Sequence, residues 1–522
     1  MEKICAIRGE YLYLPICAGR EERKLEIFLK SEGETPEKIF EFMVPVDGTA
    51  TGEYACDFYA QIPVRQYQGR KLLICGAFPP AFEEGIFVSG KRQTGRQERP
   101  AVHFTADSGW TNDPNGLIYG EGVYHLYFQY NPFNISWNNM SWGHAVSEDL
   151  LHWRQEDTVL FPDGNGTIFS GCAIGNDRGL LGLPREALLF FYTAAGGSND
   201  WSRGREFTQK IAYSLDGGRT LCKMEEPCVP TVCRENRDPK VYWHEESQAY
   251  VMVLWLEEND FGIFRSGDLA HWEQSDRLTL EGAWECPDLL HLRGEGGESC
   301  WFFWAADGFC FPGKFDGYHF RPDGGRQRAY VNGIPYAAQT CSGVTGRVIS
   351  IPWLRMENDG RPFTGTYGIP VELGCKKAGE GYVLTQRPVR ELLERRVRIG
   401  SGEAAPGGGS LVREEGRIIC RPGKGKALVL EMRAAESSRG AYAWEINGSR
   451  VCYDPLTGLF GVDGEENRVG CGYRDLTLIV DDRILEVFFE GGVCLGTFLL
   501  RGREAGLAMP EAFVAEYAAY EV

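Results

Sequence analysis

The sequence predicts an all-β fold, and three observations support this. Short runs rich in β-branched and aromatic residues alternate with turn residues along the 522-residue chain, which contains 66 glycines. Helical periodicity is nearly absent outside one short segment, Val389–Arg396. A turn built around an aspartate recurs through the middle of the chain. Together they indicate several small sheets.

Residues 1–98 are expected to form an N-terminal β-rich accessory domain. Leu25–Leu29 and Lys71–Cys75 are strand-like runs separated by Gly and Pro. No constellation of catalytic residue types is visible in this segment.

Residues 99–390 are expected to form a five-bladed β-propeller catalytic domain. Turns around Asp149, Asp216, Asp268 and Asp316 recur at intervals of about 50 to 70 residues, and most lead to an aromatic residue. Such a turn between short strands is typical of propeller blades of four strands each.

The rest of the chain is expected to form a linker and a second β domain. Residues 391–409 are read as a connecting helix followed by the flexible stretch Gly400–Ser410. Residues 410–522 contain alternating runs such as Ala427–Met432, Leu476–Asp481 and Ile484–Phe489, which predict a C-terminal β-sandwich.

Composition excludes several function classes. The formal charge of −18 argues against binding nucleic acid, and no run of about 18 apolar residues predicts a membrane span. The 17 cysteines and 8 histidines are dispersed without zinc spacing, so neither a metal nor another cofactor is expected. The cysteines resemble the thiols of a reducing compartment, and residues 1–6 lack the pattern of an export signal; we therefore expect a cytoplasmic protein.

Three carboxylates stand out by their neighbours. Asp113 lies in Trp110–Gly116, where proline and glycine predict a tight turn. Asp238 follows Arg237, a cation expected to keep it ionised. Glu285 lies between Trp and Cys, and weakly polar surroundings would favour its protonated form. Taken singly, each acid is more often an ordinary turn or surface residue.

A propeller would change that reading, because the inner strands of successive blades converge on one end of a central channel. Asp113, Asp238 and Glu285 fall in different repeats and could meet there. Two carboxylates that flank one bond are what glycoside hydrolysis needs. Trp110, Trp137 and Phe169 would add apolar walls, and Asn112 and Gln129 would bind hydroxyl groups.

A set of motifs, taken in order, resembles glycoside hydrolase family 32, the β-fructofuranosidases that include invertases, inulinases and levanases. The resemblance covers roughly residues 101–395. Its motifs are Trp110–Gly116, Phe128–Pro132, Trp142–Ala145, Phe169–Gly171, Arg237–Pro239, Glu285–Cys286, Gly313–Gly317, Tyr336–Gln339 and Leu384–Leu392.

The resemblance implies a role for each residue that matches. Asp113 would be the nucleophile of a retaining mechanism, Glu285 the general acid and then the base, and Asp238 the stabiliser that holds fructose hydroxyl groups. Retention predicts that the carboxyl groups of Asp113 and Glu285 lie roughly 5–5.5 Å apart. The expected substrate-binding residues are Trp110, Asn112, Gln129, Trp137, Phe169, Ser170, Arg237 and Trp304.

The expected function is removal of terminal, non-reducing β-D-fructofuranosyl residues from sucrose, fructo-oligosaccharides or fructose disaccharides. A fructosyltransferase that uses the same covalent intermediate, and a non-catalytic fructan-binding protein, are the alternatives. The expected partner is a small-molecule carbohydrate. For residues 1–98 three roles stay open: covering the mouth of the pocket, self-association into a homo-oligomer, or binding sugar.

Overall fold

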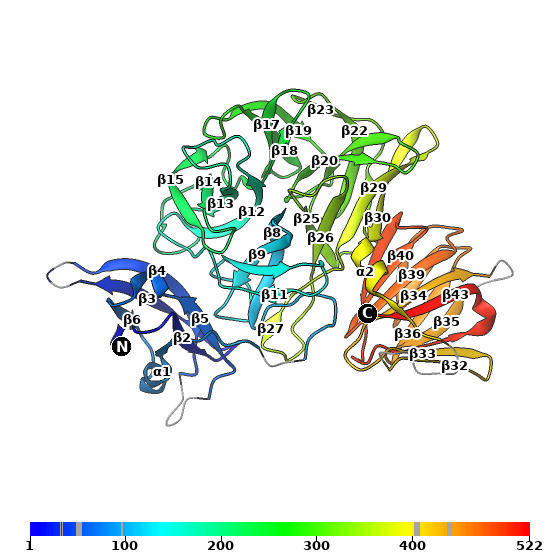
Figure 1. Ribbon diagram of the computed structural model, residues 1–522, viewed down its shortest axis with the longest axis horizontal. Helices are drawn as coiled ribbons and strands as arrows, with labels where there is room; N and C mark the ends of the chain where they lie inside the picture. Colours follow the sequence, from blue (N-terminus) through cyan, green and yellow to red (C-terminus); the bar gives the residue numbers. More distant parts are fainter. Residues whose placement is uncertain (32, 34, 49–54, 96–97, 401–407, 436–440) are drawn as a thin grey trace.

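The computed structural model describes residues 1–522 except 32, 34, 49–54, 96–97, 401–407 and 436–440. Within these ranges the chain is almost entirely β-structure, as the sequence predicts (Figure 1). Helix is limited there to α1 (Pro80–Gly85), α2 (Arg390–Arg395) and two short 3-10 turns, η1 (Arg65–Tyr67) and η2 (Glu511–Phe513). No helix in the described ranges has the length and apolar character needed to cross a membrane.

The N-terminal strands form two sheets with a common apolar core, and the two expected strands lie in β3 and β6. Alternate residues of β3, including Leu25, Ile27 and Leu29, are buried in that core. The first sheet has the order β1 (Glu2–Ala6), β6 (Lys71–Gly76), β3 (Glu22–Lys30), β4 (Glu37–Pro45), and the second β5 (Phe58–Pro63), β2 (Tyr11–Ile16), β7 (Phe87–Ser89).

Five sheets follow in chain order, and the four main strands of each are antiparallel neighbours. The first strands of four of these sheets touch: β8 (Gly109–Gly120) contacts both β12 (Thr167–Gly175) and β25 (Pro335–Thr340), and β12 contacts β16 (Arg237–His244). The strands of the first three sheets are β8 (Gly109–Gly120), β9 (Val123–Asn131), β10 (Ser141–Ser147), β11 (Arg154–Gln155) with parallel β27 (Phe363–Thr364); β12 (Thr167–Gly175), β13 (Leu188–Ala195), β14 (Phe207–Ser214), β15 (Cys222–Val229); and β16 (Arg237–His244), β17 (Ala249–Glu257), β18 (Asp260–Ser266), β19 (Glu273–Thr279). Those of the last two are β20 (Asp288–Arg293), β21 (Ser299–Trp304), β22 (Phe309–Phe315), β23 (Phe320–Pro322), β24 (Gln327–Arg328); and β25 (Pro335–Thr340), β26 (Val348–Leu354), β28 (Thr366–Tyr367), β29 (Val371–Ala378), β30 (Gly381–Pro388).

The recurring aspartate of the sequence marks the same place in four of these sheets, the turn from the third strand to the fourth. Asp149 accepts hydrogen bonds from the backbone N–H groups of Leu151 and His152 at 3.0 and 2.8 Å. Asp216, Asp268 and Asp316 cap their turns in the same way. The number of residues between successive aspartates varies because the other loops of each sheet differ in length.

The C-terminal strands form a six-stranded and a seven-stranded sheet with one apolar core between them. The three runs expected to be strands lie in β34, β39 and β40, and the expected helix is α2. Most of the stretch expected to be flexible, Gly400–Ser410, lies outside the described residues. The sheets are β31 (Val397–Arg398), β43 (Val514–Glu521), β34 (Leu428–Ala434), β39 (Asp475–Asp481), β40 (Ile484–Phe489), β41 (Cys494–Leu499); and β32 (Ser410–Glu414), β33 (Arg417–Arg421), β42 (Leu507–Pro510), β35 (Tyr442–Ile446), β36 (Ser449–Asp454), β37 (Leu459–Val462), β38 (Glu465–Arg468).

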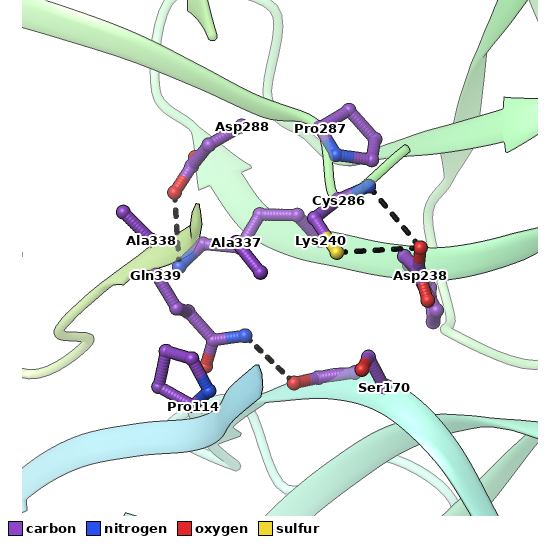
Figure 2. Close-up of a pocket in the computed structure, with 12 residues that line it drawn as sticks. Pro114, Ser170, Asp238, Lys240, Cys286, Pro287, Asp288, Ala337, Ala338 and Gln339 are labelled. Carbon is purple, nitrogen blue, oxygen red and sulfur yellow. Dashed lines mark hydrogen bonds and ion pairs between the residues drawn. The ribbon is translucent and has the colours of Figure 1, made fainter. Parts of the chain in front are cut away.

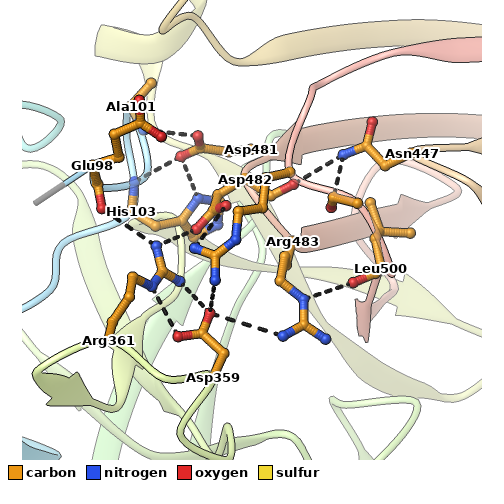
Figure 3. Close-up of polar contacts among 12 residues, drawn as sticks. Glu98, Ala101, His103, Asp359, Arg361, Asn447, Asp481, Asp482, Arg483 and Leu500 are labelled. Carbon is orange, nitrogen blue, oxygen red and sulfur yellow. Dashed lines mark hydrogen bonds and ion pairs between the residues drawn. The ribbon is translucent and has the colours of Figure 1, made fainter.

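A buried charge cluster joins the C-terminal sheets to the segment that precedes β8 (Figure 3). The His103 ring lies 2.9 Å from Asp481 and 3.2 Å from Glu486, and Asp481 also accepts the backbone N–H groups of Ala101 and Val102. These two carboxylates raise the pKa of His103 to about 9, although burial alone would lower it. The imidazolium therefore stabilises this junction at neutral pH.

Candidate active site

The site residues lie on irregular strands, and the irregularities place them. The pairing register shifts between Thr111 and Pro114 on β8, and corresponding shifts occur near the start of β12, β16 and β25. A bulge of this kind re-aims the side chains of the extra residues. The residues within these shifts are Asn112, Asp113, Phe169, Ser170, Asp238, Pro239, Ala337 and Ala338.

The prediction of a tight turn at Trp110–Gly116 is therefore wrong, because this segment is part of the continuous strand β8. Proline is tolerated here since a bulge leaves a strand position without a required N–H donor. β8 and β9 form a hairpin joined across Glu121 and Gly122, both at positive φ.

Three residues of the site hold a left-handed backbone that non-glycine residues rarely adopt. The φ angles are 65° at Asp238, 34° at Glu285 and 42° at Cys286. Each such conformation costs about 1–3 kcal/mol and persists where neighbouring contacts enforce it. One such contact is the backbone N–H of Asp238, which donates to Oγ1 of Thr193 at 3.1 Å.

The three acids meet in one cleft of about 390 Å³, although they come from distant parts of the chain. Asp113 lies on β8, Asp238 on β16, and Glu285 just before β20. The cleft is lined by Asn112, Asp113, Gln129, Trp137, Met140, Phe169, Ser170, Phe207, Glu235, Arg237, Asp238, Glu285, Tyr336 and Trp353. A cleft of this size with aromatic walls and convergent polar groups suits a small sugar.

Most of the expected substrate-binding residues line this cleft. Trp137 and Phe169 form an edge-to-face pair with ring centroids 6.1 Å apart. Gln129 is buried, and its amide nitrogen has no partner among the described residues, which leaves a donor for a ligand. Trp110 lies behind the lining: its indole N–H donates to Oδ1 of Asn112 at 2.9 Å and its ring packs against Trp353.

The expectation for Trp304 is wrong. It lies on β21, the second strand of its sheet, and is 2% exposed. Its ring packs edge-to-face against Tyr330 in an apolar core at a centroid distance of 5.7 Å. Because its ring is enclosed in this apolar core, the side chain serves packing and is not among the residues that line the cleft.

Arg237 contacts a different acid from the one expected. Its Nη2 and Nε atoms donate to one oxygen of Glu285 at 2.8 and 3.1 Å, whereas Asp238 is 3.9 Å away. The other oxygen of Glu285 accepts the Tyr336 hydroxyl at 2.5 Å. Glu285 is therefore surrounded by strong donors instead of the weakly polar neighbours expected. The guanidinium also lies 3.9 Å from the ring centroid of Trp255.

Burial dominates the electrostatics of the other two acids. It raises the pKa of Asp238 to about 7, since it outweighs the opposing effect of Arg237, and the charges of Glu285 and Asp113 act in the same direction as burial. The expectation that the adjacent Arg237 keeps Asp238 ionised is therefore wrong. Burial and the charge of Glu285 also raise the pKa of Asp113.

Cys286 lies between the two buried acids, and Figure 2 shows its contacts with Asp238. Its backbone N–H donates to Asp238 at 3.1 Å, and its thiol lies 3.4 Å from Asp238 and 3.7 Å from Asp113. The hydroxyl of Ser170 donates to Asp113 at 2.6 Å. Each carboxylate is thus held by short, directional contacts before any ligand binds.

The structure also contains a buried ion pair between Lys240 and Asp288 that no sequence pattern predicted (Figure 2). Nζ of Lys240 lies 3.3 Å from Asp288 and donates to the carbonyl and hydroxyl oxygens of Thr340 at 2.7 and 2.8 Å. Within the described ranges no group of three or more His, Cys, Asp or Glu side chains has the arrangement of a metal site.

Five lining residues were missed as site residues: Met140, Phe207, Glu235, Tyr336 and Trp353. Tyr336 stands in a recognised motif, which was the available signal. Phe207 and Trp353 carry no local signal, because an aromatic residue on a strand is more often part of a core.

Comparison with known proteins now identifies the family. A family model described as the glycosyl hydrolases family 32 N-terminal domain matches residues 103–388, more than half of the chain. The chain belongs to glycoside hydrolase family 32. Its matched segment contains all three acids and every residue that lines the cleft.

Relatives and solved structures extend this result. The family 32 chain is 35% identical over 327 residues to a levanase of Bacillus subtilis (strain 168), a match covering 56% of this chain and 47% of the levanase. Such matches span about half to two-thirds of the curated relatives' length. The exo-inulinase structure from Aspergillus awamori aligns with a TM-score of 0.70 at 24% identity, covering 82% of this chain and 99% of that one. A family 32 structure from Bifidobacterium adolescentis aligns with a TM-score of 0.67 at 17% identity and covers 99% of both chains, so its fold includes the N-terminal sheets.

Proposed function

We propose that this family 32 protein is a retaining, exo-acting β-fructofuranosidase that releases terminal fructose from sucrose, fructo-oligosaccharides or fructose disaccharides. The observation that carries the proposal is the convergence of Asp113 and Glu285 in one sugar-sized cleft. We further propose that the five central sheets are the blades of a five-bladed propeller and that the C-terminal sheets form a β-sandwich beside it.

In the proposed mechanism, Asp113 attacks the anomeric carbon of the bound fructose. The Ser170 hydroxyl and the Cys286 thiol both contact Oδ2 of Asp113, so Oδ1 is the oxygen proposed to attack. Glu285 delivers the proton that the leaving oxygen needs, and later takes one from the attacking water. Arg237 and Tyr336 each hold one oxygen of Glu285 and so fix its carboxyl plane.

Asp238 would bind fructose hydroxyl groups and favour the positively charged transition state. Gln129, with its unpartnered amide nitrogen, and Asn112 would bind further hydroxyl groups. Trp137 and Phe169 would form the apolar wall of the fructose site. A cytoplasmic location also stays a proposal; it is supported by the cysteines, all seventeen of which lie in the described ranges and are free thiols.

The test is incubation with sucrose, kestose, inulobiose, levanbiose and inulin, with products resolved by chromatography. Release of free fructose from the chain end is expected, and proton NMR should show that the first product retains the β configuration. Asp113→Asn should abolish turnover while leaving the fold intact. Near wild-type activity of that variant would refute the assignment of the nucleophile, and transfer products at high sucrose would favour a fructosyltransferase.

A further inference from the structure

The loop at residues 132–140, between β9 and β10, forms one rim of the cleft and carries Trp137. The Trp137 side chain is 54% exposed and contacts Phe169 across the opening. An exposed indole on a loop needs support if it is to present a fixed surface to a sugar.

The N-terminal domain is drawn in blue beside the central sheets in Figure 1. It contacts both ends of this loop. At one end, Phe133 is fully buried in the N-terminal core, with its ring centroid 4.2 Å from that of Phe42. At the other end, Asn139 exchanges two hydrogen bonds with the backbone of Met43, at 2.8 and 2.9 Å.

Glu22 of β3 holds the middle of the loop on both sides of Trp137. One of its oxygens accepts the side-chain amide of Asn134 and the other accepts that of Asn138, each at 2.7 Å. A carboxylate can only accept hydrogen bonds, so it turns the nitrogen of each amide toward itself.

With their nitrogens turned toward Glu22, the side chains of Asn134 and Asn138 direct their amide oxygens at the backbone of the loop. The amide oxygen of Asn134 accepts the backbone N–H of Ile135 at 2.8 Å, and the amide oxygen of Asn138 accepts that of Asn139 at 2.8 Å. One carboxylate therefore orients two asparagine amides, one before and one after the tryptophan, and each amide oxygen accepts the backbone N–H of the following residue.

We propose that Glu22 is a positioning residue through which the N-terminal domain holds Trp137 in place as a wall of the sugar site. Among the three roles left open for residues 1–98, this proposal is nearest to covering the mouth of the pocket, because the domain would support the rim of the cleft. The proposal rests on the proposed function in one respect, since it takes Trp137 to contact the sugar.

Hydrogen–deuterium exchange tests the support of the loop without using activity. In Glu22→Ala, the amides of Ile135 and Asn139 should exchange at least tenfold faster, while peptides from β2 in the N-terminal core should not change. Glu21→Ala is the matched control, because Glu21 is its sequence neighbour with a side chain 77% exposed. Unchanged exchange at the two loop amides in Glu22→Ala would overturn the proposal.

Kinetics test the consequence for the cleft. Glu22→Ala should raise KM for sucrose or kestose about fivefold to tenfold with kcat within about twofold, since the loop touches none of the three acids. Glu22→Gln should have a smaller effect: its one oxygen can still accept one asparagine amide, while its nitrogen faces the other. Should Glu22→Ala prove too unstable to purify, this variant carries the same tests.

A double-mutant cycle with Trp137→Ala decides whether Glu22 acts through the tryptophan. The double variant should show no higher KM than Trp137→Ala alone. Additive increases would overturn the proposal, and so would a wild-type KM in both single variants. Failure of the proposed function looks different: the wild-type protein would release no fructose from any substrate, while the exchange result would stand.

Discussion

Asp238→Asn should make the protein more stable at neutral and alkaline pH while removing most of its activity. The Asp238 side chain is buried and close to two other carboxylates, so its negative charge is costly in the folded protein without substrate. Asparagine has nearly the same shape, carries no charge, and its oxygen can still accept the backbone N–H of Cys286.

The magnitude follows from the pKa of Asp238, which folding raises from 3.8 to about 7. Between these two pH values the folded protein binds a proton that the unfolded chain has already lost, so wild-type stability falls as pH rises through this window. At about 1.4 kcal/mol per pH unit, the loss is at most about 4 kcal/mol by pH 8. Asparagine does not titrate and escapes this loss.

The assay is the melting temperature of wild type and Asp238→Asn between pH 4 and pH 8.5. The two should differ little at pH 4, and the variant should melt roughly 5–10 °C higher at pH 8 if the central sheets determine the transition. Asp177→Asn, which changes an exposed aspartate of the same sheets, is the control and should match wild type throughout. A gain that does not depend on pH, or a less stable variant at pH 8, would refute the reasoning.

Three further predictions concern Glu285, the proposed proton donor, and the junction between the C-terminal sheets and the segment that precedes β8. Glu285→Gln should slow hydrolysis of sucrose far more than that of an aryl fructoside with a good leaving group; an equal loss on both would count against the proton-donor role. Tyr336→Phe, which removes one of the donors that fix Glu285, should lower kcat about tenfold or more in steady-state assays with little change in KM, and a wild-type kcat would contradict it. His103→Gln should destabilise most below pH 6.5 and least above pH 9, because the raised pKa of about 9 gives the wild type a contribution that is lost as pH rises through that value. Melting curves at pH 6, 8 and 10 measure this difference, which should shrink by about 3 kcal/mol; a constant difference would argue against a charged His103.

The strands and the acids of the site could be predicted from the sequence, because both are marked by patterns of a few consecutive residues. Alternation in the run that became β3, and the Asp-capped turns that close four of the central sheets, are properties of a few consecutive residues. The neighbours of Asp113, Asp238 and Glu285 in the chain were sufficient to single them out, and all three line the cleft.

Errors arose where a neighbour in the chain was taken for a neighbour in space. Arg237 precedes Asp238, yet the register shift after Arg237 turns the two side chains apart and sends the guanidinium to Glu285. Trp304 was grouped with the aromatic residues of the cleft, but its strand faces a core. Pro114 led to the prediction of a turn, but it lies in strand β8 next to a β-bulge.

The sequence by itself determined the kinds of element and the identity of the reactive groups, since strand patterning and residue chemistry are local. Only the tertiary structure decided how charge is shared among the acids, because burial and contacts between sheets set the pKa of Asp238 and the partners of Glu285. It alone also revealed that Glu22, more than a hundred residues away in the chain, holds both sides of Trp137. Such a contact forms only when two separately folded sheets pack together, and no pattern along the chain encodes it.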